Sequence, residues 1–157
     1  MSEKALSAGT ILSDGAYILG CQPFGRKANP NSFDLPKGHW EEGEEIVDTA
    51  VREMLEETGY TIKREWLVDL GRYEYVPLKD LHVFFCATDA LPQVSTLKCT
   101  TFFPYKGREV PEVIGYKWIP VDDLSWFFPA LQKVLEKALD KFGQMELEAE
   151  DNDSTPH

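Results

Sequence analysis

The residues best suited to do chemistry lie in a glutamate-rich segment from Glu41 to Glu57. This segment holds eight acidic residues and one base, Arg52. Its apolar residues recur at helical spacing, which predicts a helix from Glu44 to Thr58. Gly59 follows at the position that a C-terminal glycine usually takes, so it ends the predicted helix. The chemistry of the segment then depends on the direction in which each carboxylate points.

A helical wheel separates these acids into two groups. At about 100° per residue, Glu45, Asp48 and Glu56 lie around the solvent pole, as in an ordinary solvated helix face. Glu53 and Glu57 instead fall on the flank of the apolar stripe, beside residues that must pack against a core. A solvated charged face therefore explains the first group but not the second.

The glutamates at the end of this helix repel one another. Glu53 and Glu57 are four residues apart, and like charges at that spacing are destabilising. Together with Glu56 they lie in the last turns, where the helix dipole disfavours anions. A bound cation would remove these penalties, and carboxylate oxygens without His or Cys suit a hard ion such as Mg²⁺ or Mn²⁺. Because Mg²⁺ pairs with phosphate oxygens, the segment predicts a phosphorylated substrate.

The spacing of these residues resembles the Nudix box at every defined position. The matching residues are Gly38, Glu44, Arg52, Glu53, Glu56, Glu57 and Gly59, with Met54 and Tyr60 in the two apolar positions. The box spans Gly38 to Tyr60, and the order of elements around it extends the resemblance to the Nudix hydrolase family from about Ser7 to Phe142. The resemblance implies an α/β fold, the Nudix α/β/α sandwich with a mixed β-sheet, in which the box forms a loop-helix-loop.

The resemblance also implies an enzyme, a Nudix pyrophosphohydrolase that uses Mg²⁺ or Mn²⁺ to hydrolyse a nucleoside diphosphate linked to another group X. By position, the implied metal ligands are Glu53, Glu56, Glu57 and the carbonyl of Gly38. Arg52 and Glu44 are implied to orient the helix, which is a structural role more than a chemical one.

The proton acceptor for the attacking water stays open between two kinds of carboxylate. One is a glutamate of the box, Glu53, Glu56 or Glu57. The other is Glu112, six residues before Trp118, which resembles the late-loop glutamate of the family and is also what a second metal would need. The plainer interpretation of Glu112 is an exposed loop acid.

The substrate is predicted from residues outside the box. The segment from Phe33 to His39 resembles Nudix enzymes that cleave diadenosine tetraphosphate asymmetrically. Lys37 and His39 would suit a polyphosphate chain, and Tyr75 and Phe103 could stack a base, although such residues are also common at surfaces and in packing. We therefore expect a dinucleoside polyphosphate, with ADP-ribose, an RNA 5′ end or a non-catalytic nucleotide-binding module as alternatives.

The elements that must position these residues follow from apolar runs and turn residues. Ser13-Asp14-Gly15 predicts a hairpin between the runs Thr10 to Leu12 and Ala16 to Cys21. Further strands are expected at about residues 65–75, 82–87 and 113–119, a surface loop at 91–111, and a closing helix at 131–142. This order predicts one mixed α/β domain, residues 1–143.

The net charge of −11 is concentrated in two segments. Besides the glutamate helix, residues 144–157 carry five acids and no Lys or Arg, and we expect this tail to be disordered. The remaining chain is nearly neutral, which disfavours nucleic acid as the main partner and favours a small-molecule nucleotide. The three cysteines lack CxxC spacing, which predicts free thiols. We expect neither a signal peptide nor a membrane span, and we therefore predict a cytoplasmic protein. The oligomeric state stays unknown.

Overall fold

The computed structural model describes residues 4–153, and its centre is a six-stranded mixed sheet. Five strands form one path in the order β4, β5, β1, β2, β8, and the short strand β3 pairs with β1. Their bounds are β1 Ala5–Ser13, β2 Tyr17–Pro23, β3 Lys37–His39, β4 Leu67–Val76, β5 Lys79–Ala87 and β8 Val113–Pro120. Strand β1 is parallel to β5 and buried from Ser7 to Ser13, as expected for a central strand covered on both faces.

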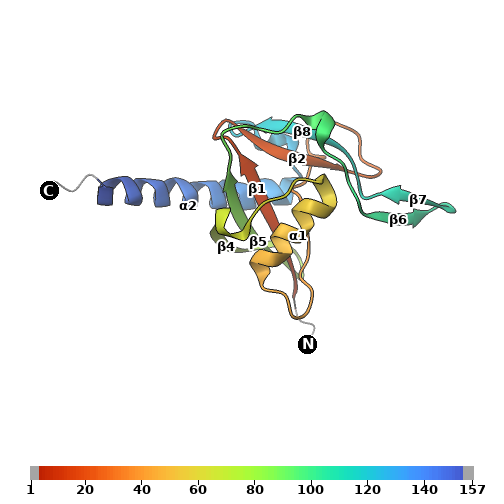
Figure 1. The fold of residues 1–157 in the computed structure, drawn as a ribbon, viewed down its shortest axis with the longest axis horizontal. Helices are drawn as coiled ribbons and strands as arrows, with labels where there is room; N and C mark the ends of the chain where they lie inside the picture. The colour runs from red at the N-terminus through yellow and green to blue at the C-terminus, as the bar shows by residue number, and fades with distance from the viewer. Residues whose placement is uncertain (1–3, 154–157) are drawn as a thin grey trace.

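The two α-helices, α1 (Ile46–Thr58) and α2 (Pro129–Asp153), lie on opposite faces of the sheet (Figure 1). Helix α1 packs through Ala50 against Ala8 and Phe84. Helix α2 contributes Leu131, Val134, Leu135 and Ala138 to a larger cluster with the other face of the sheet. The predicted α/β/α sandwich with a mixed sheet is confirmed.

The helix that carries the glutamates begins and ends close to its predicted bounds. Gly59 caps its C-terminus with a φ of 73°, and the Gly59 amide donates to the carbonyl of Leu55 at 2.8 Å. This left-handed conformation is the reason for a glycine here, because a β-carbon disfavours it. The box is therefore a loop, a helix and a loop, as predicted.

Strand β1 pairs with β2 only next to their turn and with β3 over its other half. In the turn, Asp14 Oδ1 accepts hydrogen bonds from the amides of Ala16 and Tyr17, both at 2.9 Å. Beyond this turn β1 and β2 diverge, and the ladder between them contains the single pair Ser13 and Ile18. The opposite half of β1 pairs with β3 instead. The start of the box is thereby hydrogen-bonded to the central strand.

The predicted surface loop from Leu91 to Pro111 is wrong for its second half. After a 3₁₀ helix at Val94–Thr96, strands β6 (Phe102–Tyr105) and β7 (Arg108–Pro111) form a separate two-stranded sheet that projects from the body (Figure 1). Lys106 and Gly107 make its turn, with φ values of 50° and 78°. The prolines that suggested a loop are tolerated because both strands of a two-stranded ribbon are edges.

The expected disorder of the acidic tail is also wrong over the part of the chain that the structure describes. Helix α2 continues to Asp153, ten residues beyond Gly143. Met, Leu, Ala and Glu are good helix formers, and they extend a helix that is already anchored by its packed first turns. Residues 154–157, the rest of the predicted tail, lie outside the described range.

The remaining expectations about the chain concern its thiols and membranes. Cys21, Cys86 and Cys99 are all buried and free, as predicted. Within residues 4–153, neither helix is both long and apolar enough to cross a membrane. A cytoplasmic location remains a prediction.

Candidate active site

The candidate site is a cavity of about 480 Å³ between the start of β1, strand β3, helix α1 and the base of the β6–β7 hairpin. Its acidic wall consists of Glu41, Glu53, Glu56 and Glu112. Its basic residues are Lys37, Arg52 and Lys79, with His39 beside them. Both signs of charge therefore line one space, and residues far apart in the sequence contribute to each.

Glu53 is the most buried acid of this cavity. It is 8% exposed, and its carboxylate lies directly against Gly38, where a β-carbon would stand 2.0 Å from Glu53 Cδ. Gly38 leaves room for this carboxylate, because a side chain at position 38 would occupy its place. Burial raises the pKa of Glu53, and the neighbouring charges of Glu56 and Glu112 act in the same direction.

Arg52 connects the acids of the box. Its Nε donates to Glu44 Oε2 at 2.8 Å and its Nη2 to Glu44 Oε1 at 3.1 Å, so the predicted pair of Arg52 and Glu44 is present. The other nitrogen, Nη1, donates to Glu53 Oε1 at 2.7 Å and to Glu56 Oε2 at 3.2 Å. The hydrogen bonds from Arg52 lower the pKa of Glu44 to about 2. Arg52 thus touches the acidic wall as well as orienting the helix.

Glu57 is placed differently from the other box glutamates. Its carboxylate accepts a hydrogen bond from the backbone amide of Lys37 at 2.8 Å, and it is not one of the residues that line the cavity. Burial raises the pKa of Glu57 to about 9, and the nearby acids Asp34 and Glu53 add to this effect. The structure therefore brings Glu53, Glu56 and Glu112 to one cavity. Glu57 does not line this cavity and is instead bonded to the backbone of Lys37, the first residue of β3.

The basic wall contains one residue that the sequence analysis did not select. Lys37 Nζ lies 3.2 Å from Asp34 Oδ2, whereas Lys79 makes no ion pair with any described residue. Burial and the charge of Lys37 lower the pKa of Lys79. Lys79 reaches the cavity because β5 pairs with β1, and β1 pairs with β3. No local pattern in the sequence indicates that neighbourhood.

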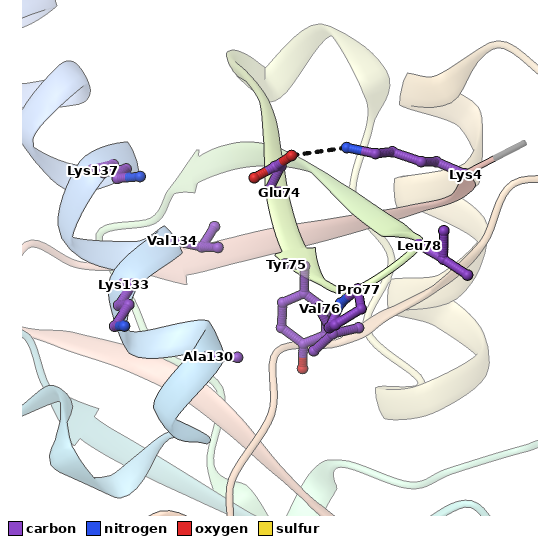
Figure 2. Close-up of a pocket in the computed structure, with 10 residues that line it drawn as sticks. All are labelled: Lys4, Glu74, Tyr75, Val76, Pro77, Leu78, Ala130, Lys133, Val134 and Lys137. Carbon is purple, nitrogen blue, oxygen red and sulfur yellow. Dashed lines mark hydrogen bonds and ion pairs between the residues drawn. The ribbon is translucent and has the colours of Figure 1, made fainter.

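The two aromatic candidates for base stacking do not line this cavity. Phe103 packs edge-on against Phe24, with 5.4 Å between the ring centroids. Tyr75 lines a second cavity of about 460 Å³, formed by the turn between β4 and β5 on one side and helix α2 on the other (Figure 2). The Tyr75 ring still supports the first cavity, because Lys37 Nζ lies 5.3 Å from its centroid. Phe103 is therefore not placed to stack a base in this cavity.

The donor set fits a hard divalent cation, although the acids do not converge on one point. Among residues 4–153, no three Asp, Glu, His or Cys side chains stand close enough together to hold a metal ion. Arg52 Nη1 pairs with the carboxylates of both Glu53 and Glu56, and it supplies positive charge there. Three acids and the backbone at Gly38 offer oxygen atoms alone, which is the ligand chemistry of Mg²⁺ and Mn²⁺.

Comparison with known proteins identifies the family. A sequence profile of the NUDIX domain matches residues 3–142. The chain belongs to the NUDIX family. This result confirms the predicted Nudix pyrophosphohydrolase at the level of its class, and it covers nearly the whole described chain. No sequence among curated proteins matches this one.

Solved structures of the family share the fold at low sequence identity. The NUDIX domain of Shewanella oneidensis NrtR, complexed with ADP ribose, is 16% identical with a TM-score of 0.63, and the match covers 90% of both chains. An ADP-ribose pyrophosphatase from Streptococcus suis is 16% identical with a TM-score of 0.58, covering 87% of this chain and 90% of that one. A bifunctional NMN adenylyltransferase/ADP ribose pyrophosphatase from Francisella tularensis, complexed with AMP and a Mn ion, is 19% identical with a TM-score of 0.59, covering 88% of this chain and 43% of that one.

These matches do not confirm the expected closeness to diadenosine tetraphosphate hydrolases. Two of the three similar proteins are ADP-ribose pyrophosphatases and the third binds ADP ribose. At these identities the likeness concerns the fold, so the substrate of the present Nudix protein has to be argued from its own residues.

Proposed function

We propose that this Nudix protein hydrolyses a pyrophosphate bond in a nucleoside diphosphate linked to X, with Mg²⁺ or Mn²⁺ as cofactor, and that its preferred substrate is a dinucleoside polyphosphate. The observation that carries the proposal is that acids and lysines line one and the same cavity. Carboxylates suit a divalent cation, and lysines suit the phosphate oxygens that such a cation also binds. A metal–polyphosphate complex has a cation for the carboxylates and phosphate oxygens for the lysines.

Each wall has a proposed task. Glu53, Glu56, Glu112 and the Gly38 carbonyl would hold the metal, which would supply Lewis acidity toward the phosphoryl oxygens. Glu57 accepts from the Lys37 amide and so fixes the backbone next to Gly38. Glu53, Glu56 and Glu112 all line the cavity, and we propose that one of these carboxylates takes the proton of the attacking water.

The lysines of the cavity, Lys37 and Lys79, favour a substrate with a long phosphate chain. Lys37 and Lys79 lie on the same cavity, and burial together with these two lysines lowers the pKa of His39. Two neighbouring cations repel each other, and an extended anion would relieve this repulsion along its length. ADP-ribose is the second candidate, favoured by the two ADP-ribose pyrophosphatases and the ADP ribose complex among the similar structures.

A substrate panel tests the proposal. Wild-type protein with Mg²⁺ would be assayed on diadenosine polyphosphates, ADP-ribose, nucleoside triphosphates and 5′-triphosphorylated RNA. We expect the highest kcat/KM for diadenosine tetraphosphate, with a nucleotide released from each half. A much higher kcat/KM for ADP-ribose would contradict the substrate choice. Absence of hydrolysis of every substrate, with and without added metal, would favour a non-catalytic binding module.

Substitution of Glu53 tests the acidic wall. Glu53→Gln keeps the shape of the side chain and removes its charge, so we expect kcat to fall on the order of 100-fold or more with little change in Tm. Glu45→Gln is the matched control, because Glu45 is exposed at the N-terminal cap of the same helix and pairs with Arg64. Near-normal turnover by Glu53→Gln would contradict the proposed metal site.

A further inference from the structure

Ser7 has a buried hydroxyl without a hydrogen-bond partner. The residue is 1% exposed in the central strand β1, and its Oγ bonds to no other described residue. A buried hydroxyl without a hydrogen-bond partner destabilises the folded protein. A bound molecule could supply the partner that the protein itself does not. Ser7 also lines the cavity of the candidate active site. The missing partner can therefore come from whatever fills that cavity.

The surroundings of Ser7 indicate the charge of this partner. Ser7 pairs with His39 of β3 on one side and with Leu81 of β5 on the other. Because side chains alternate along a strand, Lys37 and Lys79, each two residues from those neighbours, share the face of Ser7. Lys37 already has Asp34 as its counter-ion, whereas Lys79 makes no ion pair among the described residues. On this face of the sheet two lysines thus lie near Ser7, and one of them has no ion-pair partner among the described residues.

We propose that the Ser7 hydroxyl donates a hydrogen bond to a phosphate oxygen of the substrate, at the floor of the cavity between Lys37 and Lys79. This inference rests on the proposed function in requiring a phosphate chain, and it is independent of the nucleoside attached to it. A hydroxyl that donates to an anionic oxygen makes a short, strong hydrogen bond. Ser7 is then a substrate-binding residue that reduces stability in the free protein and gains its partner on binding.

The experiment measures binding and stability in the same variants. Ser7→Ala would be titrated calorimetrically with inorganic tripolyphosphate in the presence of Mg²⁺, because this probe contains the phosphate chain without any nucleoside. We expect affinity about 10-fold weaker than wild type, with a Tm that is unchanged or higher because an unpaired buried hydroxyl has been removed. Ser7→Cys keeps the size and is a weak donor, and it should lose affinity in the same way.

Thr10→Val is the matched control. Thr10 lies on the same strand and is fully buried, and its Oγ1 likewise bonds to no described residue, but it does not line the cavity. This variant should keep wild-type affinity for tripolyphosphate, with an unchanged or higher Tm.

Two outcomes would overturn the inference. One is wild-type affinity in both Ser7 variants, and the other is an equal loss of affinity in Thr10→Val. Failure of the proposed function is a separate result, since it appears as absent turnover of diadenosine tetraphosphate by wild-type protein. Weaker tripolyphosphate binding by Ser7→Ala would still support the role of Ser7 in that case.

Discussion

At the scale of single residues, one guanidinium organises the box. Arg52 donates hydrogen bonds to Glu44, Glu53 and Glu56. Its Nη2 also donates to the carbonyl of His39, in β3, at 2.9 Å. Its charge is shared by Glu44, which precedes α1, and by Glu53 and Glu56, which would otherwise repel each other in the last turns of the helix. The side chain therefore joins helix α1 to the strand that carries Gly38, and it does so through charge-assisted hydrogen bonds.

The pairing of Glu44 with Arg52 predicts a dependence of stability on pH. The folded protein holds the pKa of Glu44 at about 2, below its ordinary value of 4.5. The stabilisation is present above pH 4.5 and is lost as the pH falls toward 2, because protonation removes the charged partner of Arg52. We expect Glu44→Gln to lower the free energy of unfolding by about 1–2 kcal/mol at pH 7 and by progressively less below pH 4.5.

Urea unfolding at pH 7, 4.5 and 3 would measure this difference between wild type and Glu44→Gln. Glu42→Gln is the control, since Glu42 is an exposed acid of the same loop. A difference between wild type and Glu44→Gln that stays constant down to pH 3 would show that the ion pair is not its source.

At the scale of elements, the box depends on the exact place where α1 stops. Gly59 turns the chain in a left-handed conformation, and a β-carbon there would lie 3.2 Å from the backbone oxygen of Lys98. The segment after the helix is thus packed against the loop that leads to the β6–β7 hairpin. Glu112 lies at the base of that hairpin and lines the same cavity as Glu53 and Glu56 of the box.

Replacement of Gly59 tests this helix end. Gly59→Ala should lower the free energy of unfolding by about 1–2 kcal/mol, because an alanine is strained in the left-handed region. Gly143→Ala is the opposite control, since Gly143 lies within α2 and an added β-carbon there meets no atom within 4 Å. That variant should gain about 0.5–1 kcal/mol. Equal effects of the two substitutions in urea unfolding would contradict the capping argument.

At the scale of the whole molecule, the net charge of −11 has two separate sources. Of the acids in the box, Glu41, Glu53 and Glu56 line a cavity together with Lys37 and Lys79, so this part of the charge belongs to the candidate site. The acids after Gly143 lie on the end of α2, which extends beyond the sheet (Figure 1). Residues 144–151 are all exposed, so this end buries no part of the core.

Removal of residues 144–157 tests the proposed domain of residues 1–143. We expect kcat/KM within about 2-fold of wild type and a loss of stability below about 1 kcal/mol, because exposed helix ends contribute little packing. A chain ending at Leu139 is the control, since it also loses Phe142, which stacks on Phe85 with 3.9 Å between the ring centroids. This shorter chain should unfold at a clearly lower temperature. A large loss of stability in the longer one would instead include the end of α2 in the domain.

The sequence by itself determined the features that depend on local spacing. The periodicity of α1, its end at Gly59 and the placement of Glu53 beside the core follow from a helix of 3.6 residues per turn, and the match to the Nudix box rests on the same spacing. The five longer strands of the sheet were likewise readable as apolar runs, whereas the short strand β3 was not predicted. These features need no knowledge of distant parts of the chain.

Only the tertiary structure decided which distant residues share the site. Lys79 and Ser7 reach the cavity through the pairing of β1 with β5 and β3, and Phe103 is held away from it by Phe24. Glu57 carries the same box signature as Glu53, yet the amide of Lys37 holds it beside the cavity. The physical reason is that strand pairing and side-chain packing join residues of large sequence separation, and a one-residue change of register would exchange the faces on which they lie.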